Sequence, residues 1–158
     1  LELETFSNNV WECACGGGHL SEVLLNSGYN VRSTDLIDRN YAGELVDFLA
    51  IDNIQMWDGD IITNPPYKYA EQFVEKALSI IPRGKKVAMF MGIQFVEGKK
   101  RREFLKRFPI KTVYVSSSRL NCAKNGDFEK YNSNSARCYA WYIWEKGFNG
   151  TTELKWFN

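Results

Sequence analysis

The chain has 158 residues, enough for one domain with a single substantial core. It carries 20 Lys and Arg against 19 Asp and Glu, a formal net charge of +1, so a nucleic-acid partner would need a local basic patch. No apolar run is as long as a membrane span, and four cysteines do not suggest a disulfide framework, so we expect a cytoplasmic, reduced setting.

The first part of the chain alternates short apolar runs with glycine turns. A buried strand is predicted at 9–13, and it leads into a glycine loop at 16–18. A short helix should follow, with Leu20, Val23 and Leu24 on one face and Gly28 as its left-handed C-terminal cap. A second strand at 29–34 ends in Asp35, and a degraded strand ends near Val46.

The rest of the chain continues the alternation of strands and helices. Predicted elements are strands at 60–63, 86–93, 112–116 and 138–144, and helices at 69–81 and 97–108, with a polar loop at 121–137. Strand–helix–strand repetition predicts an α/β fold with a doubly wound, mostly parallel sheet. Ligands bind at the carboxyl ends of the strands in such sheets, and the motifs described below all follow strand ends.

The glycine loop and Asp35 indicate a nucleotide-like ligand, but weakly. Gly16 and Gly18 let a backbone approach a ligand closely because they carry no Cβ. Asp35, at the end of the second strand, could accept hydrogen bonds from a ribose diol. The dinucleotide fingerprint is incomplete, since Ser21 stands where its third glycine would be. The competing interpretation of this loop is a simple tight turn.

Asn64-Pro65-Pro66-Tyr67 is a more specific signal. An amino nitrogen on an aromatic ring or acyl group is a poor nucleophile because its lone pair is delocalised. The side-chain oxygen of Asn64 and the carbonyl of Pro65 could accept its hydrogens and favour a nucleophilic geometry. Two prolines make the turn rigid, so these acceptors need no reorganisation, and Tyr67 offers a face for a base. The competing interpretation is an ordinary Asn-Pro turn.

The whole pattern resembles one enzyme family. Residues 12–20, Asp35-Leu36, Asp47-Phe48 and the Asn-Pro-Pro-Tyr turn occur in the order seen in class I S-adenosylmethionine-dependent amino-methyltransferases. The closest resemblance is to small phage-related DNA N6-adenine methyltransferases. It implies a Rossmann-like, seven-stranded sheet with an antiparallel strand near the C-terminus, in a bacterial or phage-encoded protein.

The resemblance also implies roles for individual residues. The methionine part of the cofactor, S-adenosyl-L-methionine, would be held by Glu12 and by the backbone of Ala14, Cys15, Gly16 and Gly18. Asp35 would bind the ribose hydroxyls, Asp47 would accept from the adenine amine, and Phe48 would pack on the adenine ring. Leu36, next to Asp35, also belongs to the implied cofactor site. Asn64, Pro65, Pro66 and Tyr67 would hold and activate the target nitrogen. We expect residues 1–158 to be one catalytic domain that lacks the family's N-terminal segment and a separate target-recognition domain.

Two further features bear on partners and metals. Lys99, Lys100, Arg101 and Arg102 form a basic stretch that could contact DNA phosphates, although such a run is often only a solvated helix face. Cys13 and Cys15 lack the usual zinc-ligand spacing, so we expect small buried cysteines and no metal.

Three functions therefore stay open. The favoured one is methylation of adenine N6 in DNA, with a specificity partner or a homodimer to supply recognition. Methylation of an RNA base or of a protein glutamine uses the same turn, since both substrates present a planar nitrogen. The third is an inactive cofactor-binding subunit of a larger complex.

Overall fold

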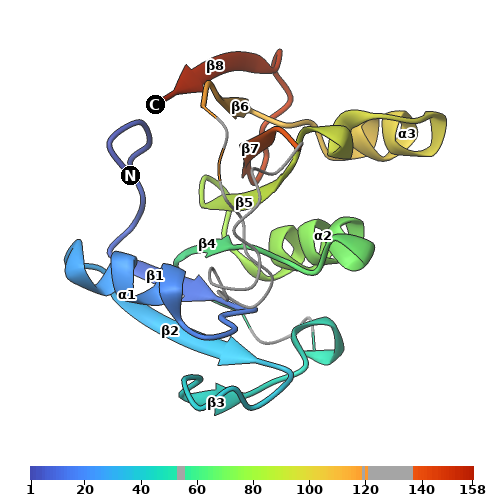
Figure 1. The fold of residues 1–158 in the computed structure, drawn as a ribbon. Helices are drawn as coiled ribbons and strands as arrows, with labels where there is room; N and C mark the ends of the chain where they lie inside the picture. The colour runs from blue at the N-terminus through green and yellow to red at the C-terminus, as the bar shows by residue number, and fades with distance from the viewer. Residues whose placement is uncertain (53–55, 119, 121–136) are drawn as a thin grey trace.

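The strands form one sheet, which explains where each motif lies. A computed structural model describes residues 1–52, 56–118, 120 and 137–158, and in this part of the chain the sheet has eight strands in the order β3-β2-β1-β4-β5-β7-β6-β8 (Figure 1). The strands are β1 (Asn9–Glu12), β2 (Asn30–Asp35), β3 (Glu44–Leu45), β4 (Asp60–Thr63), β5 (Lys86–Gly92), β6 (Thr112–Ser116), β7 (Tyr139–Glu145) and β8 (Glu153–Phe157).

The predicted mostly parallel α/β sheet is confirmed, with one difference in its strand count. Strand β7 runs antiparallel to both of its neighbours, β5 and β6, and every other pair is parallel. The sheet has β8 as an additional edge strand, parallel to β6. Four of the five residues of β8 are exposed, so the strand lacks the buried apolar pattern by which a strand is recognised in a sequence.

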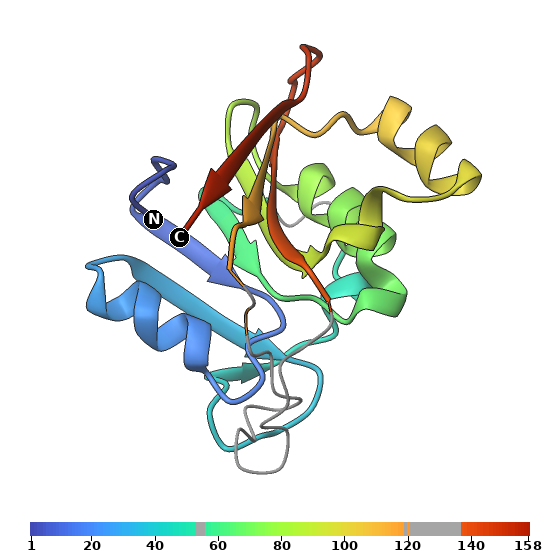
Figure 2. The same ribbon diagram turned by 45° about the horizontal axis from the view of Figure 1, so that its top comes forward.

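Helices cover the two faces of the sheet unequally (Figures 1 and 2). The helices are α1 (His19–Asn26), α2 (Ala70–Ile80) and α3 (Lys99–Arg107), with 3-10 turns at Phe48–Ala50, Tyr67–Tyr69 and Ile93–Val96. Helices α2 and α3 pack in the larger core cluster with the side chains of one sheet face. Helix α1 joins the smaller cluster on the opposite face through Leu24. The sheet is therefore wound on both faces, as predicted. No helix among the described residues is long and apolar enough to cross a membrane.

Helix α1 buries a narrower face than predicted. Leu24 is fully buried and Leu20 partly so, but the side chain of Val23 is 55% exposed. The buried partner of Leu24 is Ser21, three residues earlier on the same face. A short helix that packs on the sheet with only a narrow strip of its surface leaves the residues beside that strip, such as Val23, in solvent. Gly28 follows the helix with φ +89°, as predicted for its cap.

Helix α2 supplies most of the core on its face of the sheet. Ala70, Phe73, Val74, Ala77 and Ile80 recur at helical spacing, and all are buried. The ring of Phe73 stacks on that of Phe48, with centroids 5.2 Å apart. This packing holds the start of α2, and so the turn before it, against the end of the sheet.

We predict that Phe73→Ala destabilises the fold by about 3 kcal/mol, because it removes a buried ring and leaves a cavity beside Phe48. Urea denaturation measures the change in the free energy of unfolding. Val23→Ala is the control, since this residue is exposed and should cost less than about 0.5 kcal/mol. Equal effects of the two substitutions would contradict the core position of Phe73.

Candidate functional site

The candidate site lies where the order of the strands reverses. The chain passes outward from β1 to β2 and β3, and then returns to place β4 on the other side of β1. Asp35 ends β2, the glycine loop follows β1, Asn64 follows β4 and Gly92 ends β5. These strands are parallel neighbours, so their carboxyl ends meet at one edge of the sheet. Open α/β sheets bind their ligands at such a reversal point.

The two glycines of the loop that have a positive φ, Gly16 and Gly18, have different surroundings. Gly16 (φ +56°) borders open space, because a Cβ built there would meet no atom within 4 Å. Gly18 (φ +83°) is covered by the ring of Tyr41, which would lie 2.2 Å from such a Cβ. Both conformations favour glycine, but only Gly16 offers its backbone to a ligand. No sequence pattern indicates a role for Tyr41, since it lies in the poorly patterned segment after β2.

Asp35 holds the glycine loop in place. One carboxylate oxygen accepts a hydrogen bond from the backbone N–H of Gly16 at 2.8 Å, and the other accepts from the N–H of Ile37 at 2.9 Å. Each oxygen of a carboxylate can accept a second bond. Asp35 can therefore order the loop and still accept from a ligand hydroxyl.

Glu12 is a buried carboxyl group beneath the loop. Its side chain is 2% exposed and accepts a hydrogen bond from Ser21 Oγ, which also lies 2.7 Å from Ser33 Oγ. Burial and, to a smaller extent, the charge of Asp35 raise the pKa of Glu12 to about 7, although hydrogen bonds with Ser21 oppose the rise. Glu12 can therefore gain or lose its proton near neutral pH. Ser21, which interrupts the glycine pattern, is a partner of this carboxyl.

The remaining predicted cofactor residues differ in accessibility. Asp47 and Leu36 are exposed, and Asp47 Oδ1 accepts from the N–H of Leu49 at 3.1 Å, which caps a 3-10 turn. Phe48 is 2% exposed, and its ring packs on Trp11 and Phe73. That Phe48 also packs on a cofactor ring stays a prediction, and the structure gives this ring two core partners.

The Asn64-Pro65-Pro66-Tyr67 turn presents two accessible side chains on a buried base. Every residue of β4 is buried, as is Pro65, whereas Asn64 and Tyr67 are exposed, the latter by 41%. Pro66 is extended (φ −61°, ψ 117°), and its carbonyl accepts from the N–H of Tyr69 at 2.8 Å. The turn is thus held by its prolines and by the start of α2, while the side chains of Asn64 and Tyr67 reach solvent.

A cavity of about 440 Å³ opens beside Tyr67. Its size is that of a small-molecule site. Its wall comes from the turn after β4, the end of β5 and the segments that follow β5. The lining residues are Tyr67, Ala70, Met91, Gly92, Gln94, Phe95, Arg101 and Arg137.

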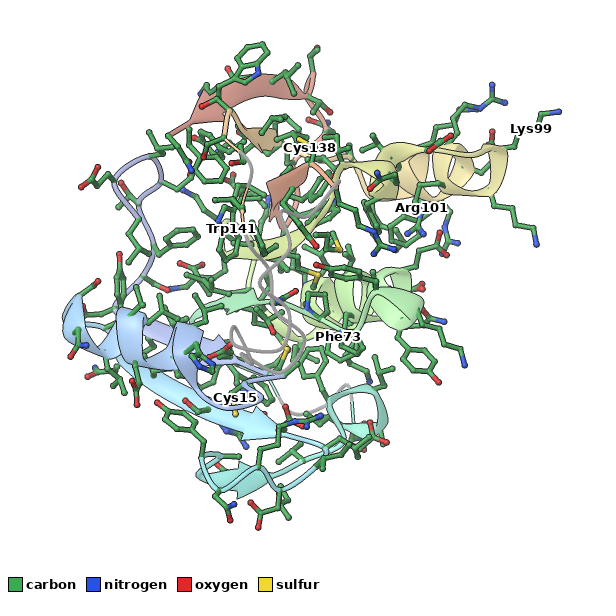
Figure 3. The ribbon with its side chains drawn as sticks, in the orientation of Figure 1. Cys15, Phe73, Lys99, Arg101, Cys138 and Trp141 are labelled. Carbon is green, nitrogen blue, oxygen red and sulfur yellow. The ribbon has the colours of Figure 1, made fainter. Side chains whose placement is uncertain are left out.

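The predicted basic stretch divides into two parts (Figure 3). Lys99, Lys100 and Arg102 are exposed, and Arg102 pairs with Glu103 at 3.1 Å. Arg101 instead extends from α3 toward α2, where it pairs with Glu71 at 3.2 Å and lines the cavity. The outer residues remain candidates for phosphate contact, and Arg101 belongs to a different environment.

The cysteines and the polar loop complete the predicted features. Cys13 and Cys15 are buried, and burial raises the pKa of both thiols, that of Cys15 to about 11. In the described part of the chain, no group of three His, Cys, Asp or Glu side chains is placed to hold a metal ion. The predicted loop at 121–137 lies outside the described residues apart from Arg137.

Known proteins resemble this chain in structure and not detectably in sequence. No protein-family model matches it, and no curated protein sequence does. A TehB-like S-adenosylmethionine-dependent methyltransferase from Corynebacterium glutamicum superposes with a TM-score of 0.59 at 14% identity, over 92% of this chain and 83% of that one. A protein of Agrobacterium tumefaciens described as a predicted O-methyltransferase gives a TM-score of 0.60 at 12% identity, over 94% of this chain and 77% of that one.

A third similar structure is that of a longer chain. It is described as a modification subunit of a putative type I restriction enzyme from Vibrio vulnificus, with a TM-score of 0.63 at 12% identity, over 91% of this chain and 41% of that one. The fold of the present chain is therefore that of the Rossmann-like class I methyltransferases. The descriptions of these proteins differ in the atom or substrate named, so the fold does not decide which group this chain acts on.

The buried carboxyl of Glu12 predicts a pH-dependent stability. Its pKa in the folded chain, about 7, lies above the ordinary 4.5, so the folded state holds the proton more tightly. Stability should therefore fall as the pH rises from 4.5 to 7, by on the order of 1–3 kcal/mol from this group. Glu12→Gln, which can still accept from Ser21, should flatten this part of the profile.

Urea denaturation at several pH values between 5 and 8 measures this effect. Glu22→Gln is the control, because Glu22 is an exposed carboxyl in the first turn of α1. A Glu12→Gln profile as steep as that of the unaltered chain would show that Glu12 ionises normally.

Proposed function

We propose that this chain is an S-adenosylmethionine-dependent methyltransferase that modifies the N6 nitrogen of adenine in DNA. One observation carries the proposal. The Asn64-Pro65-Pro66-Tyr67 turn ends β4, and the glycine loop ends the adjacent strand β1, on the two sides of the reversal point. Acceptors for an amino group and a cradle for a nucleotide-like cofactor therefore occupy the same edge of the sheet.

The residues around the glycine loop fit S-adenosylmethionine. Gly16 borders open space, Asp35 keeps acceptor capacity for ribose hydroxyls, and Glu12 lies beneath the loop. Asp47 is exposed at the end of the neighbouring segment and can accept from an adenine amine. When bound, this cofactor supplies a methyl group on a positively charged sulfur, and the target nitrogen takes that methyl in a direct displacement. The fit rests on side chains from β1, β2 and the segment after β3.

The turn after β4 would hold and activate the target nitrogen. Asn64 Oδ1 and the carbonyl of Pro65 accept the hydrogens of the amino group and draw its lone pair out of conjugation. The prolines hold these acceptors rigidly, so they need not reorganise during the reaction. The exposed ring of Tyr67 stacks on the base. The methylated amine loses its proton to solvent, so no side chain is required as a base.

DNA is favoured as the substrate by two observations. Lys99, Lys100 and Arg102 present positive charge on the outer surface of α3, near the cavity that Arg101 lines. A structurally similar protein is described as the modification subunit of a restriction enzyme. On duplex DNA the target adenine would have to leave the stack to reach Asn64. A specificity partner or a second copy of the chain would supply sequence recognition.

A methyl-transfer assay tests the proposal directly. The chain is incubated with methyl-labelled cofactor and with DNA, RNA and protein pools, and the labelled product is digested to identify the modified atom. Label on N6 of deoxyadenosine is the expected result. Label on an RNA base or on glutamine would move the same chemistry to another substrate, and no label in any pool would refute the enzymatic activity.

Asn64→Ala should lower the transfer rate by at least about 100-fold, since it removes a positioned acceptor. Cofactor affinity, measured by calorimetry, should remain within about 2-fold, because Asn64 lies in the turn after β4 and not in the glycine loop. Asn26→Ala, an exposed asparagine at the end of α1, is the control and should change neither quantity. Equal losses of transfer and of cofactor binding would indicate a structural role.

Asp35→Ala should have the opposite pattern and weaken cofactor binding first, by about 10-fold or more. The substitution removes an acceptor for the ribose and also frees the Gly16 and Ile37 N–H groups that the carboxylate orders. Asp38→Ala is the matched control, an exposed acid three residues later, in the segment that follows β2. Unchanged cofactor affinity in calorimetry would exclude Asp35 from the cofactor site.

A further inference from the structure

Contacts on two sides hold Arg101 in the wall of the cavity beside Tyr67. Its guanidinium lies over the ring of Phe95, 4.0 Å from the ring centroid. Its Nε is 3.2 Å from a carboxylate oxygen of Glu71 on α2. Stacking and pairing together fix the plane of the guanidinium at the cavity wall, which a lysine could not reproduce.

One donor of this guanidinium lacks a partner. Arg101 NH1 is buried and has no hydrogen-bond partner among the described residues. A buried, unpaired N–H of a charged group is costly, and native proteins rarely retain one without a use. A ligand that fills the cavity and carries an acceptor atom would remove this cost.

Gln94 places a second polar group at the same wall. Its side-chain oxygen would lie 2.8 Å from a Cβ on Gly92, so the amide rests against the backbone at the end of β5. An amide offers both a donor and an acceptor. With the ring of Tyr67, the cavity presents a stacking surface and two groups able to bond to the edge of a planar ligand.

The carboxylate of Glu71 favours a base over a phosphate as the partner of Arg101. Glu71 already compensates the guanidinium, and its carboxylate would repel an anion brought to the same place. A neutral ring nitrogen or carbonyl oxygen meets no such repulsion. Lys99 and Lys100, which are exposed on the same helix, are better placed for phosphates.

We propose that Arg101, together with Gln94, reads the target nucleobase by donating to an acceptor atom of its ring system. The inference rests on the proposed function, since it places the target base in the cavity beside Tyr67. It separates Arg101 from the phosphate-contacting role expected of the whole basic stretch, and it makes the cavity a determinant of which base is accepted.

The test compares binding of four single-stranded thymidine oligonucleotides that carry one adenine, 1-deazaadenine, 3-deazaadenine or 7-deazaadenine. Each analogue lacks one ring acceptor. Fluorescence anisotropy with the full chain should show that one analogue binds about 5- to 20-fold more weakly than adenine. Arg101→Met should bind the adenine probe as weakly as that analogue and should discriminate less than about 2-fold.

Arg107→Met is the matched control. Arg107 also joins α3 to α2, through Glu75 at 3.2 Å, and also lies near an aromatic ring, that of Phe108, but it does not line the cavity. It should keep the full preference for adenine. Because Arg101→Met could disturb packing, Gln94→Leu serves as a second variant at an exposed position, and it should reduce the same preference without loss of thermal stability.

Three outcomes would overturn the inference. The first is equal binding of all four probes by the unaltered chain. The second is a preference that survives in Arg101→Met. The third is that Arg101→Met weakens the binding of all four probes equally and reduces the salt dependence of binding by about one phosphate contact. Arg101 would then contact the DNA backbone and not the base. Methyl transfer measured in parallel separates the hypotheses: a base preference without transfer refutes only the proposed activity, and transfer without an Arg101-dependent preference refutes only the reading role.

Discussion

The carboxylate of Asp35 accepts hydrogen bonds from Gly16 and from Ile37, and through them one side chain connects the end of β2 to the loop that follows β1. Two backbone bonds support the same loop: the N–H of Cys15 donates to the carbonyl of Thr34 on β2 at 3.0 Å, and the N–H of Gly18 donates to the carbonyl of Cys15 at 2.8 Å. The open space beside Gly16 exists because the loop keeps this conformation. A residue expected to serve a ligand therefore also builds the place where the ligand would lie, and the two roles are compatible because each carboxylate oxygen accepts more than one bond.

The main elements of the fold were predictable because their signals are local. Helix α2 follows from apolar residues at helical spacing, and β5 from a continuous apolar run that ends at a glycine. Strand β8 was missed because an edge strand that leaves four of its five residues in solvent shows no buried pattern. Val23 was assigned to the wrong face because periodicity gives the direction of a side chain but not the width of the surface that a short helix covers.

The candidate site was predictable in its chain order but not in its contacts. Strand ends could be recognised, and parallel pairing places those of β1, β2 and β4 at one edge, so Asp35, Gly16 and Asn64 lie at the ends of neighbouring strands. The cover that Tyr41 forms over Gly18, and the bond from Ser21 to Glu12, depend on packing between segments that no local pattern connects. The same holds for Arg101: in the sequence it is one of several adjacent cations, and only its contacts with Glu71 and Phe95 separate it from its neighbours.

The near-neutral charge of the chain is compatible with a nucleic-acid substrate, because some of its cations are exposed and others are paired with carboxylates. A net charge of +1 provides little long-range attraction, and pairs such as Arg107 with Glu75 reduce the field of α3 further. Affinity for a polyanion would then be modest and, within the part of the chain that the structure describes, would rest on exposed cations such as those at the start of α3. Under that condition, discrimination among bases has to come from the cavity. There the guanidinium of Arg101, whose charge Glu71 compensates, would distinguish ligands by their shape and hydrogen-bond acceptors more than by their charge. An enzyme arranged in this way would depend on a partner, or on a second copy of itself, to remain on DNA, while its own cavity decided which base reacts.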